Sequence, residues 1–142
     1  MIGLIKFLKM TLKKILVFGN PLVRRDSIPL KLIDNLRNEF PNIEFKEFDS
    51  IEEIQNEGDT LYILDSVEKI KKVMVITDLD QLATDKIYSV HDFDLATNLK
   101  ILKKVGVIKN IIILGVPMNI THSQALQEIR EKIISISISK ND

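Results

Sequence analysis

Cysteine is absent from this chain of 142 residues, histidine occurs only as His91 and His122, and neither sign of charge is in excess. Without cysteine the chain has no disulfides, thiolate metal sites or cysteine nucleophile, so any metal must use oxygen and nitrogen ligands. The 20 basic residues balance the 20 acidic ones. Net charge therefore gives no reason to expect a nucleic-acid or anionic-membrane partner.

Several motifs that bind nucleotides or carry hydrolytic chemistry are also missing. No G-x-G-x-x-G follows the first apolar run, and the chain has no Walker lysine motif, no G-x-S-x-G and no H-E-x-x-H. These absences argue against ordinary dinucleotide-binding, P-loop and zincin functions. We expect no organic cofactor.

The first ten residues, MIGLIKFLKM, are mostly apolar. They are too short to span a bilayer, which takes about 20 apolar residues, and no small-residue cleavage site follows them. We therefore expect a soluble cytoplasmic protein with no membrane partner. Met10 directly precedes the first clear strand, so we interpret residues 1–13 as an N-terminal extension and Met10 as an alternative start.

Apolar residues make up 45% of the chain, which is enough for one domain spanning residues 1–142. From Lys14 onward, short apolar runs alternate with helical patterns. This order is typical of a largely parallel sheet with helices on both faces. The sequence therefore predicts an α/β fold, a three-layer α/β/α sandwich with a mostly parallel, twisted central sheet of about five strands.

The predicted strands are short runs rich in branched apolar residues, at 15–18, 43–49, 60–67, 71–78 and 110–117. The second alternates apolar and charged residues, which indicates a strand near the sheet edge. Helices are predicted over 28–40 and 50–57, in a segment ending at Gly106, and over 125–136. The last helix ends in IISISIS, which also alternates like a strand. We favour helix there because the helical period begins well upstream.

Two predicted strands reach an aspartate near their C-terminal ends, Asp65 and Asp78. In open α/β sheets the ligand crevice lies outside the carboxyl ends of the strands. We therefore expect both residues, and the loop after Phe18, to converge at one rim.

Asp26, Asp65 and His91 each fall in a loop or at an element end that this pattern places on the same rim. Two carboxylates and an imidazole form a suitable ligand set for a borderline divalent metal, with positions left open for substrate or water. Each residue also has a structural interpretation. Asp26 fits a helix N-cap, Asp65 a turn or cap at a strand end, and His91 a surface or capping residue.

Other polar residues are interpreted structurally. Arg24 and Arg25 are expected to be solvated, although they could receive an anionic partner. Asp78 and Asp80 are expected to serve as turn and helix-cap residues, with a supporting role near the site as the alternative. His122 lies at a predicted helix start, and we assign it no ligand role.

The segment FGNPLVRRDSIP joins the first strand to the first helix and contains Gly19, Asn20 and Leu22, followed by Asp26. With these residues the chain resembles the hydrogenase maturation proteases. These endopeptidases trim the C-terminal extension from the large subunit of nickel-iron hydrogenases after nickel insertion. The family's opening motif is a strand, Gly-Asn, one residue, Leu, two residues and two acidic positions, and Asp26 stands at the second acidic position.

The resemblance continues along the chain to about Ile134. The segment LYILDSV supplies Asp65 at a strand end before a small residue, and SVHDFDLATNLKIL supplies His91 just before a helix. The strand IIILGVP then follows in the expected place. Any one match is weak, whereas three in the family's order favour a shared site.

The resemblance implies a phosphorylase/hydrolase-like fold and a single catalytic, metal-contacting site made of Asp26, Asp65 and His91. It also implies that the nickel is supplied by the partner, the hydrogenase large-subunit precursor with its C-terminal extension. The protease then completes a coordination sphere that its substrate partly provides. Cleavage would thereby depend on metallation, because part of the binding energy exists only when nickel is present.

The chain departs from the family at three places. Arg25 replaces the first acidic residue, Pro29 replaces a glycine, and the loop 49–58 lacks the family's glycine-threonine segment. These departures indicate a divergent member with an unusual target, or one that binds its partner without efficient cleavage. The alternatives are therefore a non-catalytic, metal-sensing hydrogenase assembly partner or an unrelated α/β small-molecule-binding protein.

Overall fold

The computed structural model describes residues 11–18, 28–48, 54–79, 88–89 and 95–138. Within these ranges the strands are β1 (Lys14–Phe18), β2 (Glu44–Phe48), β3 (Thr60–Glu68), β4 (Met74–Ile76), β5 (Tyr88–Ser89) and β6 (Asn110–Pro117). The helices are α2 (Ile28–Lys31), α3 (Ile33–Glu39), the 3-10 helix η2 (Ile54–Glu57), α5 (Leu95–Lys104) and α6 (His122–Ile138). All five predicted strands are present, although β4 is shorter than the predicted stretch.

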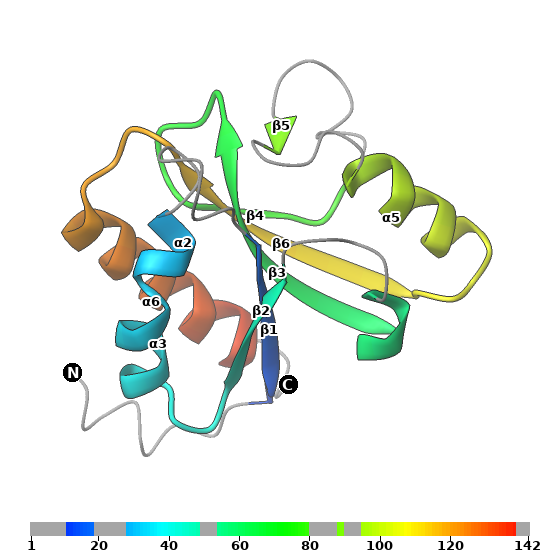
Figure 1. Ribbon diagram of the computed structural model, residues 1–142, viewed down its shortest axis with the longest axis horizontal. Helices are drawn as coiled ribbons and strands as arrows, with labels where there is room; N and C mark the ends of the chain where they lie inside the picture. Colours follow the sequence, from blue (N-terminus) through cyan, green and yellow to red (C-terminus); the bar gives the residue numbers. More distant parts are fainter. Residues whose placement is uncertain (1–10, 19–27, 49–53, 80–87, 90–94, 139–142) are drawn as a thin grey trace.

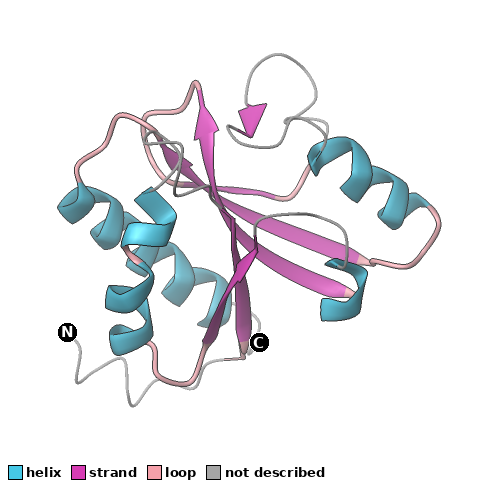
Figure 2. Cartoon of the chain, in the orientation of Figure 1, coloured by secondary structure: helices cyan, strands magenta, loops and turns pink. Residues whose placement is uncertain are grey.

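The strands form one sheet in the order β2-β1-β3-β6-β4, with β5 pairing with β3 off this path. The pairs β1–β2, β1–β3 and β3–β6 are parallel. The other two pairs, β4–β6 and β3–β5, are antiparallel. Figure 2 shows this mostly parallel, twisted sheet, with β3 in the middle of its path.

Helices cover both faces of the sheet. Figure 1 shows α2, α3 and α6 together on one side, and η2 and α5 on the other. Each face has its own apolar core of buried side chains, because successive residues of a strand point to opposite faces. The predicted three-layer α/β/α sandwich is therefore confirmed. None of the described helices combines the length and the apolar character that crossing a bilayer requires.

The edge position predicted for the second strand is confirmed, because β2 ends the strand order. Phe45 is buried, whereas its neighbours Glu44 and Lys46 are exposed. In the inner strand β1, by contrast, Ile15 to Phe18 are all buried, as an apolar run covered on both faces requires.

The helix predicted over 28–40 is present as two short helices, α2 and α3. Pro29 lies in the first turn of α2. Backbone N–H groups in a first turn have no partner within the helix, so the missing N–H of proline costs no helical hydrogen bond. The backbone N–H of Phe40 still donates to Leu36 O, but Phe40 itself is non-helical. This ending is expected because a residue before proline, here Pro41, avoids the helical conformation.

Gly106 ends α5 as the sequence predicts. Its φ is 84°, a left-handed conformation that glycine adopts without steric cost. Gly106 N donates to Lys103 O at 3.1 Å, and Val107 N donates to Leu102 O at 3.0 Å. This pair of bonds is a Schellman motif, which satisfies carbonyls that the helix end would otherwise leave unpaired.

The C-terminal segment IISISIS is helical, as favoured, up to Ile138. Ser137 is fully buried, and its Oγ accepts a hydrogen bond of 3.2 Å from Leu12 N. In addition, Thr11 Oγ1 donates to Ser137 O at 2.8 Å. The residues just before β1 are thereby attached to the last turn of α6. The rest of the expected N-terminal extension, residues 1–10, lies outside the described residues.

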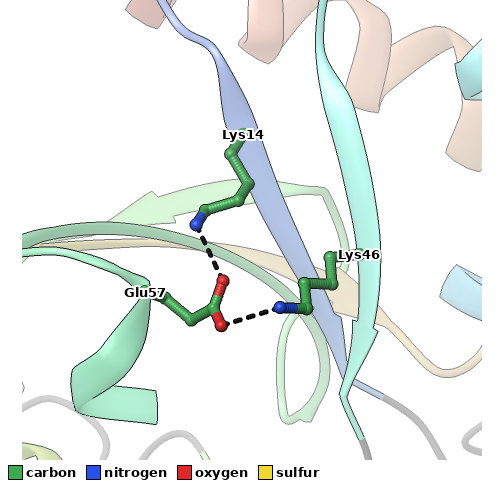
Figure 3. A network of polar contacts seen from close by, with 3 residues as sticks. All are labelled: Lys14, Lys46 and Glu57. Atoms are coloured by element: carbon green, nitrogen blue, oxygen red, sulfur yellow. Dashed lines mark hydrogen bonds and ion pairs between the residues drawn. The ribbon is translucent and has the colours of Figure 1, made fainter.

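The 3-10 helix η2 is attached to the sheet by charge. Figure 3 shows the Glu57 carboxylate between Lys14 of β1 and Lys46 of β2, with distances of 2.7 and 2.8 Å. Hydrogen bonds from the two lysines lower the pKa of Glu57 below its usual value. The helix predicted at 50–57 is thus present in its second half, and residues 50–53 lie outside the described residues.

Candidate functional site

Asp65 is a buried carboxylate in β3, the middle strand of the sheet. It is 1% exposed and lies three residues before the strand ends at Glu68. Aspartate side chains are rarely this buried unless they are paired or coordinate a ligand, so Asp65 is a candidate site residue. The prediction that Asp65 lies near a strand's carboxyl end is confirmed.

The pleat places Asp65 on the face of β3 that also carries Ile63 and Val67, which is the face covered by η2 and α5. In the parallel ladder its partner on β6 is Gly115. A Cβ at Gly115 would lie only 2.9 Å from Val67 Cγ2 and 3.2 Å from Ile76 Cδ1. Beside Asp65 there is accordingly room for a glycine but not for a larger residue.

On its other side Asp65 faces the end of β1. Leu16 pairs with Ile63 and Val17 with Leu64, so the next position in this register places Phe18 beside Asp65. The Phe18 ring is fully buried, and its centroid lies 5.7 Å from that of Phe48 on β2. Within the sheet, the Asp65 position therefore lies between Phe18 of β1 and Gly115 of β6.

Ser66 was not among the predicted site residues. It is fully buried and points to the opposite face from Asp65, and within the described part of the chain its Oγ has no hydrogen-bond partner. An unsatisfied buried hydroxyl costs about 1–3 kcal/mol. The only signal for it in the sequence is its place directly after Asp65.

A hollow of about 320 Å³ lies beyond the carboxyl ends of β3 and β6. Its walls come from Val67, Glu68, Lys69, Ile70, Met118 and Asn119. Lys69 has a φ of 66°, a conformation that costs a non-glycine residue about 1–3 kcal/mol and that often occurs at binding sites. The hollow thus begins two residues beyond Asp65 on the same strand.

The other two predicted ligands, Asp26 and His91, lie outside the described residues, as do Arg24, Arg25 and Asp80. Their nearest described neighbours are informative. Ile28 is two residues after Asp26 and begins α2, which contacts both β1 and β3. Ser89 is two residues before His91 and pairs with Val67 of β3. Figure 1 shows β5 next to the end of β3.

The expected convergence of Asp78 with Asp65 is wrong. Because β4 runs antiparallel to β6, the C-terminal end of β4 lies beside the N-terminal part of β6, at the opposite end of the strands from the C-terminal end of β3. Ile76, the last residue of β4, pairs with Ile113, and Asp78 continues away from Gly115, the partner of Asp65. Asp78 is exposed and takes no part in the rim at the end of β3.

His122 occupies the first position of α6 and is exposed, so its predicted place at a helix start is confirmed. Thr121 precedes it and accepts a hydrogen bond from Gln124 N at 3.1 Å. This contact is a helix N-cap. Within the described ranges no three potential ligand side chains of the His, Cys, Asp and Glu types form a metal-sized group, and two of the three predicted ligands lie outside those ranges.

Neither a protein-family model nor a curated protein sequence matches this chain. Among solved structures, the chain is similar to an uncharacterized protein from Wolinella succinogenes, at 14% sequence identity and a TM-score of 0.47. The similarity covers 90% of this chain and 92% of that one. We draw nothing from this likeness, and the fold rests on the sheet topology described above.

Proposed function

We propose that this protein is a metal-dependent endopeptidase of the hydrogenase maturation type. It removes the C-terminal extension of a nickel-iron hydrogenase large-subunit precursor after nickel insertion, in the cytoplasm. Asp26, Asp65 and His91 contact the nickel that the substrate carries. The observation that carries this proposal is the burial of Asp65 at 1% exposure near the carboxyl end of the middle strand.

The place of Asp65 supports the proposal in two ways. First, the carboxyl ends of parallel strands form the rim at which α/β sheets bind ligands. Second, a buried carboxylate retains strong electrostatic interactions, because little water competes for it. An oxygen ligand held in this way gains most when a cation arrives. Since the cation comes with the substrate, the site favours the nickel-loaded precursor over the empty one.

The neighbours of the other two ligands support the same rim. Helix α2, which begins two residues after Asp26, and strand β5, which ends two residues before His91, both contact β3. The hollow beyond Val67 lies at the same end of β3 and provides space for the peptide segment of the substrate. The hollow and the Asp65 carboxylate lie at the same end of β3, which supports the proposal.

To test the proposal, the purified protein is incubated with a nickel-loaded large-subunit precursor, and the mass of the precursor is followed. We expect a loss equal to the C-terminal extension, and no loss with the metal-free precursor. Asp65→Asn should abolish cleavage because it removes the charge while keeping the size of the side chain. Asp78→Asn is the matched control, since this exposed carboxylate lies at the opposite end of the strands. This variant should cleave the precursor at the wild-type rate.

Two outcomes would reject the proposed activity. Nickel-dependent co-purification with an intact precursor, without cleavage by the wild-type protein, would instead indicate an assembly partner. Equal behaviour of wild type and of the Asp26→Asn, Asp65→Asn and His91→Ala variants, with no effect of nickel, would exclude the site altogether. Urea unfolding of each variant separates loss of the site from loss of the fold.

A further inference from the structure

Exposed apolar side chains gather at the end of α5. Among the described residues, the large hydrophobic side chains that are exposed are Ile101, Val105, Val107 and Ile138, and the first three are 54%, 65% and 45% exposed. Val105 directly follows the helix and lies one turn beyond Ile101, because Val105 N donates to Ile101 O at 3.0 Å. Single exposed apolar residues are ordinary, whereas a contiguous group usually marks a binding surface.

Positive charge lies next to this group. Lys100, Lys103 and Lys104 line a hollow of about 270 Å³ together with residues 77–79, which follow β4. The three lysines share one side of α5, because they stand at helical spacings of three and four. The hollow also contains the Asp78 carboxylate, and Leu79, which is 6% exposed, adds apolar surface. The chain as a whole has no net charge, so this excess of cations is local.

The stability of the helix explains only part of this arrangement. Lys103 and Lys104 lie in the last turn, where cations interact favourably with the helix dipole. The helix is already held by Leu99, which is fully buried, and by the Schellman motif at Gly106. Neither of these needs Ile101 or Val105 to be exposed. The apolar group therefore calls for a different explanation.

We propose that residues 77–79 and 100–107, here called the α5 surface, bind an acidic segment of a partner protein that also carries apolar side chains. The partner's carboxylates pair with Lys103 and Lys104, and its apolar side chains cover Ile101 and Val105. The Asp78 carboxylate in the hollow repels the phosphates of an anionic bilayer, whereas a polypeptide can place its carboxylates beside the lysines and away from Asp78. A hollow containing a carboxylate thus fits a polypeptide better than an anionic membrane.

The α5 surface is independent of the proposed peptidase site. Residues 77–79 follow β4, whose C-terminal end lies at the opposite end of the strands from the C-terminal end of β3. Binding at the α5 surface and cleavage at the peptidase site can therefore be measured separately. A variant that loses binding at the α5 surface should still cleave the precursor.

The test is an NMR titration of the isotope-labelled full chain with a synthetic peptide of glutamate and leucine, and with a second peptide in which lysine replaces glutamate. We expect saturable shifts at residues 77–79 and 99–107 with the acidic peptide alone. The double variant Lys103→Glu, Lys104→Glu should weaken binding about tenfold, and Val105→Ser about threefold. The matched control is Lys71→Glu, Lys72→Glu, an exposed lysine pair before β4 that should bind like wild type.

Three results would overturn the proposal. The first is the absence of saturable shifts at the α5 surface, or equal binding of both peptides. The second is binding of phosphatidylserine vesicles that depends on the same lysines, while the acidic peptide causes no chemical-shift changes. This result would assign the surface to lipid. The third is a sedimenting dimer that Val105→Ser dissociates, which would assign it to a second copy of this chain.

Discussion

The two helical layers of the protein differ in how they are attached to the sheet. The layer of α2, α3 and α6 is joined to its surroundings by partly buried polar contacts as well as by its core. Arg130 of α6 bonds Glu39 of α3, and Glu128 accepts a hydrogen bond of 2.8 Å from Val73 N just before β4. The layer of η2 and α5 has the half-exposed lysine contacts of Glu57 and a helix end with exposed aliphatic side chains.

This difference suggests that one layer contributes more to stability and the other more to binding. Asp65 points to the face covered by η2 and α5, and the α5 surface belongs to the same layer. Regions that bind ligands generally come from the less stable part of a fold, because they must open or adapt. We therefore expect the first layer to provide most of the stability and the second most of the binding.

The largest expected effect contrasts the two layers directly. Ile133 of α6 is fully buried in the first core, and Ile133→Ala should lower the free energy of unfolding by about 2–5 kcal/mol, through lost burial and a residual cavity. Ile101→Ala on α5 is the matched control and should change it by no more than about 0.5 kcal/mol. Urea denaturation measures both. Equal losses would show that the layers do not differ in this way.

The second prediction concerns the tight packing beside Asp65. Gly115→Ala should destabilise the protein by about 1–3 kcal/mol, because the added Cβ would lie 2.9 Å from Val67 Cγ2. Val67→Ala should therefore cost less in the Gly115→Ala background than in the wild type. Strictly additive free energies from a urea double-mutant cycle would contradict this contact.

The third prediction concerns the ion pair between α3 and α6. Glu39→Gln should cost about 1–2 kcal/mol, because it leaves Arg130, whose side chain is only 21% exposed, with a weaker partner. That pairing also raises the pKa of Arg130. The exposed pair of Lys109 and Asp59, 3.7 Å apart, is the control, and Asp59→Asn should have an effect near zero. A loss of stability at Asp59 as large as that at Glu39 would contradict this difference between a part-buried and an exposed ion pair.

The smallest expected effect is the pH dependence of the attachment of η2. The folded-state pKa of Glu57 lies below the ordinary value of 4.5, so its contribution to stability is fully present above about pH 4.5 and declines as the pH falls through the lower, folded-state pKa. The contribution should be about 1 kcal/mol or less, since Lys14 and Lys46 are 31% and 44% exposed and water screens the pair.

Urea unfolding measured across this acidic range tests the effect. Glu57→Gln should flatten the decline in stability, and Lys14→Met combined with Lys46→Met should flatten the same part of the curve. If both changes leave the pH profile as it is in the wild type, the attachment of η2 contributes nothing measurable to stability.

Several features of the fold follow from local patterns in the sequence. Strand β2 alternates around Phe45, which is buried between the exposed residues Glu44 and Lys46, and α5 stops at Gly106 because glycine adopts a left-handed conformation. The segment IISISIS is helical because Ala125, Ile129 and Ile133 place a buried residue every fourth position, and Ser137 continues this spacing. In each case neighbouring residues carry the signal.

The site was less predictable. The sequence identified Asp65 as a residue near a strand end, but its burial depends on Phe18 and Gly115, which come from two other strands. Asp78 was assigned to the wrong end of the sheet's strands, because no local pattern shows whether a strand runs parallel or antiparallel to its neighbour. The α5 surface was not predicted either, because its hollow forms only where residues 77–79 meet the end of α5.

The sequence by itself determined the kinds of element, most of their ends and the α/β class, because hydrophobic period, glycine and proline act over a few residues. Only the tertiary structure decided the direction of β4, the face on which Asp65 is buried and the grouping of charge and apolar surface at α5. These features depend on contacts between residues far apart in the chain, which chain order alone does not specify.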